Sequence, residues 1–88
     1  MEIVGKTEDG HLVVSGLFKL FDTSGIPLAD LFGKCFKEGL QPSWVHFIQE
    51  ADNAGWKRKT SLLRIAEALT DCKGKEYSDA VIERLQKL

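Results

Sequence analysis

The sequence predicts a mainly α-helical fold, a small bundle of about four helices that carries an N-terminal β-hairpin. Two patterns lead to this prediction. Apolar residues recur at helical spacing in successive segments after residue 26, and an Asp-Gly pair separates two apolar, largely β-branched stretches within the first sixteen residues. The chain has 88 residues, 43% hydrophobic and 28% charged, which is typical of a globular protein. We therefore expect a single domain over residues 1–88, with the hairpin in 1–16 and the bundle in 17–88.

The predicted hairpin joins Ile3-Val4 to Leu12-Val13-Val14 through a turn at Asp9-Gly10. Its register is open between two alternatives. A two-residue turn pairs Thr7 with Leu12, whereas a three-residue loop with Gly10 in a bulge pairs Thr7 with His11.

Residues 17–21 fit either a short helix, with Ser15 as its N-cap, or a third strand. Pro27 suits the first position of the next helix, and Gly39 suits its end. The apolar stripe of this helix follows the spacing i, i+3, i+4, i+7, i+8 and consists of Leu28, Leu31, Phe32, Cys35 and Phe36.

Three further helices are predicted. One opens at Pro42 and closes at Gly55, after which Trp56 occupies the hydrophobic position of a Schellman motif and packs near Ala51. A second runs over about residues 60–70, and a turn at 73–75 leads to the last. Their apolar stripes are Trp44, Phe47, Ile48 and Ala51; Leu62, Ile65, Ala66 and Leu69; and Tyr77, Val81, Leu85 and Leu88.

Several classes of function find no support in the sequence. There is no nucleophile-elbow, P-loop or dinucleotide signature and no metal-ligand spacing, so we expect no catalysis, no cofactor and no metal. The first residues lack a charged-then-apolar signal pattern, and no apolar run approaches the length of a membrane span. We therefore expect a cytoplasmic protein that does not bind membranes, with both cysteines reduced and free. A small chain without motifs suits an accessory protein of a bacterium or phage.

Four side chains are candidates for reactive groups. His46 and Glu50 share one helix face at i, i+4, but no further ligand or catalytic partner accompanies them, so we interpret them as a solvated pair. Cys35 reads as a small buried hydrophobe. Cys72 falls in a predicted turn beside two lysines, where positive charge could lower the pKa of a thiol. Because no histidine partner or resolving cysteine accompanies it, we interpret Cys72 as a free loop thiol.

The charge is distributed unevenly along the chain. The formal net charge of −1 is the sum of −4 over residues 1–56, +4 over 57–75 and −1 over 76–88. The middle segment precedes and contains the predicted fourth helix, and Trp56 adjoins it. This basic segment, defined by its six cations, would offer a phosphate-contacting surface: Lys57, Arg58, Lys59, Arg64, Lys73 and Lys75.

Residues 61–69, Ser-Leu-Leu-Arg-Ile-Ala-Glu-Ala-Leu, resemble the helix that follows the recognition helix in lambda-repressor-like helix-turn-helix proteins. The resemblance implies DNA binding by the preceding helix. That helix carries Glu50 and Asp52, whose carboxylates are unfavourable against a phosphate backbone, so the chain is not assigned to the family.

The leading hypothesis from the sequence is a non-catalytic protein–protein interaction or accessory module, binding a partner protein or its own copy. Because interface cores favour aromatic residues and arginine, Trp44, Trp56, Phe18 and Arg58 are the first candidates for its contacts. The alternative is a helix-turn-helix-like nucleic-acid-binding protein that uses the basic segment.

Overall fold

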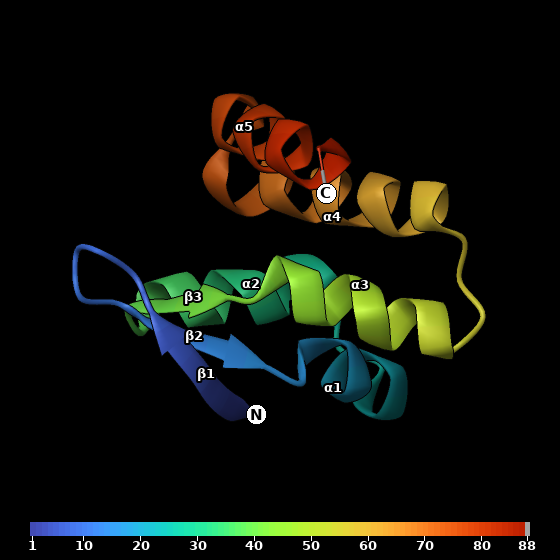
Figure 1. Ribbon diagram of the computed structural model, residues 1–88, viewed down its shortest axis with the longest axis horizontal. Helices are drawn as coiled ribbons and strands as arrows, with labels where there is room; N and C mark the ends of the chain where they lie inside the picture. Colours follow the sequence, from blue (N-terminus) through green and yellow to red (C-terminus); the bar gives the residue numbers. More distant parts are fainter. Residues whose placement is uncertain (88) are drawn as a thin grey trace.

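The computed structural model describes residues 1–87, which fold into five helices and one three-stranded sheet (Figure 1). The protein is therefore mainly helical as predicted, with one more helix and one more strand than expected. In chain order the elements are β1 (Glu2–Lys6), β2 (Leu12–Ser15), α1 (Leu17–Ser24), α2 (Leu28–Lys37), β3 (Leu40–Pro42), α3 (Trp44–Asn53), α4 (Arg58–Lys73) and α5 (Lys75–Gln86).

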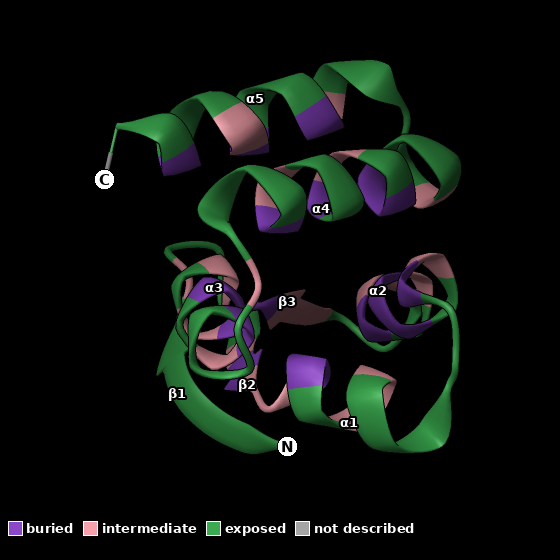
Figure 2. Ribbon diagram, turned by 90° about the vertical axis from the view of Figure 1, so that its right-hand side faces the viewer, coloured by how far each residue is buried: buried purple, intermediate pink, exposed green. Residues whose placement is uncertain are grey.

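The elements lie in layers. Helices α4 and α5 pack side by side above a layer formed by α2, β3 and α3, and β1, β2 and α1 lie on the opposite side of that layer (Figure 1). The view turned by 90° shows α4 between α5 and the rest of the chain, with the buried residues of the helices turned inward and β1 exposed along its length (Figure 2). None of the helices of residues 1–87 has both the length and the apolar character that a membrane crossing requires.

The hairpin adopts the three-residue loop. The Thr7 N–H donates to the His11 carbonyl at 2.8 Å, and the Gly10 N–H donates to the Thr7 carbonyl at 3.1 Å. Gly10 has φ 92°, the left-handed conformation that this loop type requires at its last position. A bulge at Val4 shifts the register, because Ile3 faces Val14 while Gly5 faces Val13.

The strand β3 was not predicted, and it corrects the assignment of Pro42 to a helix. Pro42 ends this strand, which runs parallel to β2 and faces Val14. The helix begins two residues later, with Ser43 as the N-cap whose hydroxyl accepts from the His46 N–H. Proline lacks an N–H, so an edge strand tolerates it where a central strand would not.

The start of α1 also differs from the prediction. Residues 17–21 are helical, but Ser15 does not cap them because it pairs with Glu2 in the sheet. The N-cap is Gly16, with φ 87°. Pro27 likewise lies one residue outside its helix, where its carbonyl accepts from the Asp30 and Leu31 N–H groups at 3.1 Å.

The predicted Schellman motif at the end of α3 is confirmed. The Trp56 N–H donates to the Ala51 carbonyl at 2.9 Å, the Gly55 N–H donates to the Asp52 carbonyl at 3.0 Å, and Gly55 has φ 93°. The next helix, α4, is longer than predicted and includes Cys72, which was expected in a turn. Leu88, assigned to the stripe of the last helix, lies outside the described residues.

The hydrophobic core draws on β2 and on every helix. Its centre is aromatic: Phe32 and Phe47 are almost fully buried, and Phe47 packs edge-on against both Phe18 and Phe32, with ring centroids 5.4 and 5.7 Å apart. The buried core residues are Val14, Leu17, Phe18, Leu28, Leu31, Phe32, Cys35, Phe47, Ile48, Ala51, Ile65, Ala68, Leu69, Val81 and Leu85. Phe18 is only 4% exposed, so it is a core residue and not the interface contact that the sequence suggested.

Candidate functional site

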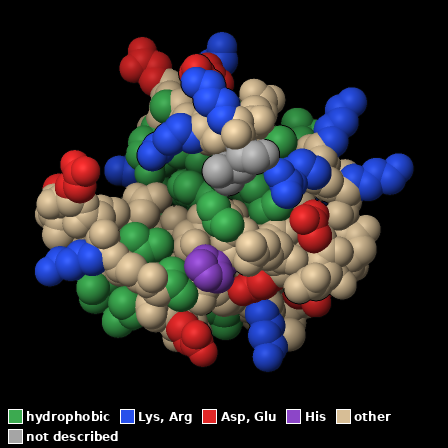
Figure 3. All heavy atoms as spheres, in the orientation of Figure 1, with side chains coloured by type: hydrophobic (Ala, Val, Ile, Leu, Met, Phe, Trp, Pro, Cys, Tyr) green, Lys and Arg blue, Asp and Glu red, His purple; other side chains and the backbone are tan. Residues whose placement is uncertain are grey.

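The basic segment does not form one surface. Lys57, Arg58 and Lys59 lie at the start of α4, whereas Lys73 and Lys75 lie at the junction of α4 and α5. Since α4 has 16 residues, about 24 Å of helix separates the two groups, and they lie at opposite ends of the molecule (Figure 1). On the face shown in Figure 3, lysines and arginines are interspersed with acidic side chains.

At the start of α4, one cation already has a carboxylate nearby. The Arg58 guanidinium lies 3.8 Å from the Asp52 carboxylate at the end of α3, and both side chains are about half exposed. Lys57 and Lys59 are exposed. At the start of α4, fewer cations are therefore available to bind an external anion than the sequence implies.

Trp56 and Arg64 belong to an aromatic cluster that joins α1 to α4. The Trp56 ring meets Phe18 edge-on at 5.0 Å between centroids and Phe21 at 6.0 Å. The Arg64 guanidinium lies 5.4 Å from the ring centroids of both Phe21 and Trp56. These contacts are cation–π interactions, so a nucleobase stacking on Trp56 would compete with packing that already exists.

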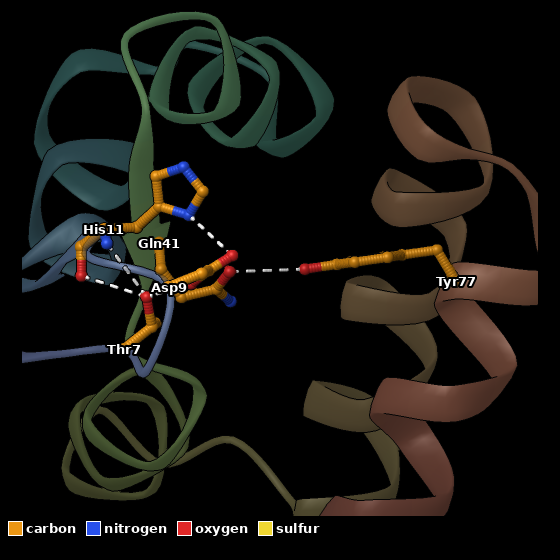
Figure 4. Close-up of polar contacts among 5 residues, drawn as sticks. All are labelled: Thr7, Asp9, His11, Gln41 and Tyr77. Atoms are coloured by element: carbon orange, nitrogen blue, oxygen red, sulfur yellow. Dashed lines mark hydrogen bonds and ion pairs between the residues drawn. The ribbon is translucent and has the colours of Figure 1, made fainter.

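Lys73 lies against aromatic rings at the other end of α4. Its ammonium nitrogen is 4.8 Å from the Phe36 centroid and 5.5 Å from the Tyr77 centroid, and the two rings are edge-on at 5.6 Å. The Tyr77 hydroxyl donates to the Gln41 side-chain carbonyl at 3.4 Å, which links α5 to β3 (Figure 4).

The tip of the hairpin lies beside this cluster and was not singled out from the sequence. The His11 Nδ1 is 3.3 Å from the Asp9 carboxylate (Figure 4). A hydrogen bond from the Thr7 hydroxyl, assisted by His11, lowers the pKa of Asp9. Asp9 and His11 border a cavity of about 230 Å³ together with Lys73 and Tyr77. No sequence signal marks it, because the unpredicted strand β3 brings these elements together.

His46 and Glu50 do not form the solvated pair that their spacing predicts. The His46 Nδ1 is 2.6 Å from the Ser43 hydroxyl, while a Glu50 oxygen accepts from the Gly16 N–H at 3.1 Å. Both residues are half-buried. His46 contacts the N-cap at the start of α3, and Glu50 connects α3 to the residue between β2 and α1. Within residues 1–87, no three side chains of His, Cys, Asp or Glu gather as metal ligands would.

The two cysteines are free, and Cys35 is buried as predicted. Burial raises the pKa of the Cys35 thiol, and the neighbouring Glu38 carboxylate adds to this effect. Burial also raises the pKa of the Cys72 thiol, and this effect outweighs the opposing influence of Lys73. Cys72 is thus a free thiol as favoured from the sequence, but it lies half-buried on α4 and not in a loop, and the neighbouring lysines do not lower its pKa below the ordinary value.

Among the predicted binding residues, Trp44 is the one that lines a groove beside α5. This α5 groove, of about 410 Å³, lies between α5 and the segment from β3 into α3. Trp44 packs edge-on against Phe32 at 5.1 Å, and its indole nitrogen is buried with no hydrogen-bond partner within the described chain. The lining residues are Thr7, Val13, Gln41, Pro42, Ser43, Trp44, Val45, Val81, Arg84 and Leu85.

The α5 groove is lined mainly by apolar residues, with Thr7, Gln41 and Ser43 as uncharged polar members and a single charged residue. Val45, at its wall, is 44% exposed, and among residues 1–87 Arg84 is the only ionisable residue that lines the groove. Arg84 makes no ion pair with another residue of 1–87. In the space-filling view, hydrophobic side chains show along the border between the α4–α5 pair and the layer below it (Figure 3).

Comparison of the chain with protein-family models, with curated proteins and with solved structures gave no match.

Proposed function

We propose that the protein is a non-catalytic protein-binding module whose α5 groove receives a segment of a partner protein. The observation that carries this proposal is the groove itself, a surface hollow lined by Pro42, Trp44 and Val45 from the segment that leads into α3 and by Val81 and Leu85 from α5. Its volume of about 410 Å³ lies within the range of roughly 300–1,000 Å³ typical of sites that bury a ligand.

The lining specifies the chemistry of the partner segment. Apolar walls stabilise an apolar side chain by removing its surface from water. The Arg84 guanidinium at the groove, which makes no ion pair within residues 1–87, adds a preference for a carboxylate, since arginine binds carboxylates with two parallel hydrogen bonds. The segment we expect therefore carries a large apolar residue close to an Asp or Glu.

Nucleic-acid binding through the basic segment has less support. Its cations are divided between the two ends of α4, and Arg64 and Lys73 already lie against aromatic rings. Phosphate binding gains affinity from several cations that follow one backbone, which this division does not provide.

Site-specific photo-crosslinking in host cells tests the proposed function. A photoreactive amino acid replaces Val45 in the groove or, as the matched control, Leu63, which is 59% exposed on α4 and outside the groove. We expect a defined protein adduct from position 45 and none from position 63.

A competition experiment with unlabelled protein tests whether the adduct forms through the groove. Excess unlabelled protein should suppress the adduct, and the Leu63→Asp variant should suppress it equally. The Val45→Asp variant should fail to compete, because it places an unpaired carboxylate on the apolar wall. Adducts of equal yield from both positions, or competition by Val45→Asp as strong as that by the unaltered chain, would contradict the proposal.

A further inference from the structure

A second hollow lies between the helices α1 and α2. The two helices follow each other in the chain and are joined by the short segment 25–27 (Figure 2). This α1–α2 pocket has a volume of about 320 Å³, within the range of roughly 300–1,000 Å³ typical of sites that bury a small molecule. It shares no lining residue with the α5 groove, so a ligand in it would leave that groove free.

The floor of the α1–α2 pocket belongs to the hydrophobic core. Leu17, Leu31 and Cys35 line it, and each is less than 10% exposed. Leu20, which is half-buried, and Ile26, which is exposed, add further apolar surface. No lining residue has a buried side-chain polar atom that lacks a hydrogen-bond partner within residues 1–87. Because such a surface offers water few hydrogen bonds, an apolar occupant gains most from it.

The rim of the pocket carries three charged side chains, all from α2 and its C-cap. Asp30, Lys34 and Glu38 follow one another at four-residue spacing, so they lie along one side of the helix. All three are exposed, and none makes an ion pair with another residue of 1–87. Two carboxylates and one ammonium group give these side chains a net charge of −1. The rim therefore favours a positively charged group on a ligand.

The electrostatics at the floor have the same sign. After burial, the Glu38 carboxylate is the larger influence that raises the pKa of the Cys35 thiol, and the opposing influence of Lys34 is smaller. Met1 also lines the pocket, but its backbone nitrogen lies toward Gly16, which does not: it is 3.7 Å from the position that a Cβ of Gly16 would take. The field at the floor thus disfavours added negative charge.

We propose that the α1–α2 pocket binds a small amphiphilic amine, with its apolar chain against the floor and its ammonium group at the rim beside Asp30 and Glu38. Burial of the chain supplies most of the affinity, since each methylene group removed from water adds about fourfold. The rim selects the sign of the head group, because Lys34 offsets only one of the two carboxylates. A carboxylate head group on the same chain is therefore disfavoured.

Alkylation of the two cysteines tests the proposal in the unaltered chain. Cys35 lines the pocket, whereas Cys72, on α4, does not and serves as the internal control. The chain reacts with iodoacetamide in the presence of octylammonium, octanol or octanoate, and mass spectrometry of the digested chain gives the rate at each cysteine. We expect octylammonium to slow alkylation saturably at Cys35 and not at Cys72. Its affinity should exceed that of octanol by about twofold to fivefold, and octanoate should be weaker than octanol. Butylammonium should bind at least about tenfold more weakly than octylammonium.

Neutralising the rim separates the contribution of charge from that of the apolar floor. The variant Asp30→Asn/Glu38→Gln should bind octylammonium no better than octanol and should keep its affinity for octanol. The matched control Glu67→Gln/Asp79→Asn removes two exposed carboxylates outside the pocket and should keep the preference for octylammonium. All four positions are exposed, so circular dichroism should show both variants folded.

Four results would overturn the proposal. They are alkylation of Cys35 that no probe slows, equal slowing at Cys35 and Cys72, octanoate as effective as octylammonium, and a preference for octylammonium that survives neutralisation of the rim. The α5 groove is a separate surface, so none of these results bears on its partner.

Discussion

Gly16 holds the junction between β2 and α1, and replacing it with alanine is expected to destabilise the fold strongly. The residue has φ 87°, and its N–H donates to Glu50 on α3. An added Cβ would lie 3.3 Å from the Met1 Cα, closer than most real Cβ contacts. Gly25, at the other end of α1, is the matched control: its φ is 71°, but a Cβ there meets nothing within 4 Å.

The expected magnitudes separate the two glycines. Alanine in the left-handed region costs about 1–2 kcal/mol at either position. At Gly16 the crowding against the backbone of Met1 adds about 1–3 kcal/mol, which is the usual penalty for overpacking. We therefore expect Gly25→Ala to lower the free energy of unfolding by about 1–2 kcal/mol, and Gly16→Ala by about 2–5 kcal/mol.

Urea unfolding followed by circular dichroism measures both variants. The midpoint should fall for each, and clearly further for Gly16→Ala, with unchanged slopes. Equal losses for the two variants would refute the reasoning, because they would show that the chain at Met1 does not crowd Gly16. A smaller loss at Gly16 than at Gly25 would contradict it more strongly.

Three further outcomes are expected. Both thiols should react with an aromatic disulfide more slowly at pH 8 than an unfolded peptide thiol, with Cys35 the slower, because burial raises the pKa of each; a faster Cys72 would contradict this. The same shifts make the folded state retain protons that the unfolded chain releases, so stability against urea should fall as the pH rises through the ordinary thiol pKa, and a rise would contradict the assignment. Finally, a labelled oligonucleotide should show no saturable anisotropy change at about 150 mM salt, whereas binding that weakens steeply with salt and depends on Lys57 and Lys59 would favour nucleic acid.

Local patterns predicted the helical part of the fold well. The stripe from Leu28 to Cys35 is buried as its spacing requires, because the helical period alone decides which side chains share a face. The end of α3 was predictable in detail, since a Schellman motif involves only the last turn, Gly55 and Trp56. The glycines that mark the ends of helices were informative for the same reason, since the end of a helix also depends on neighbouring residues.

The third strand could not be predicted from local pattern. Leu40–Pro42 is three residues long, contains a proline and pairs with β2 from across α1 and α2, so its partner is distant in sequence. The proline next to a helical stripe favoured a helix start instead. The strand forms only when the folded chain brings Leu40–Pro42 beside β2, where it adds a third strand to the two of the hairpin.

The candidate site was harder to predict than the fold. Lys57 and Lys73 belong to the same basic segment of the sequence, but the length of α4 separates them in space. Trp56, which adjoins that segment, packs against Phe18. Trp44 was identified as a binding residue, but the α5 groove that it lines joins residues more than 35 positions apart, such as Trp44 and Arg84. Proximity between residues so far apart in the sequence follows from tertiary packing, and no periodic pattern in the sequence indicates it.

Amide chemical-shift mapping tests the α5 groove most directly. The isotopically labelled chain is titrated with the segment of the protein that cross-links to position 45, and the perturbed amides are located on the fold. We expect saturable shifts at Thr7, Trp44, Val45, Arg84 and Leu85, which line the groove, and unchanged signals at Leu63. Saturable shifts confined to β1 or to residues 57–59, with the groove unperturbed, would contradict the assignment of the groove as the binding surface.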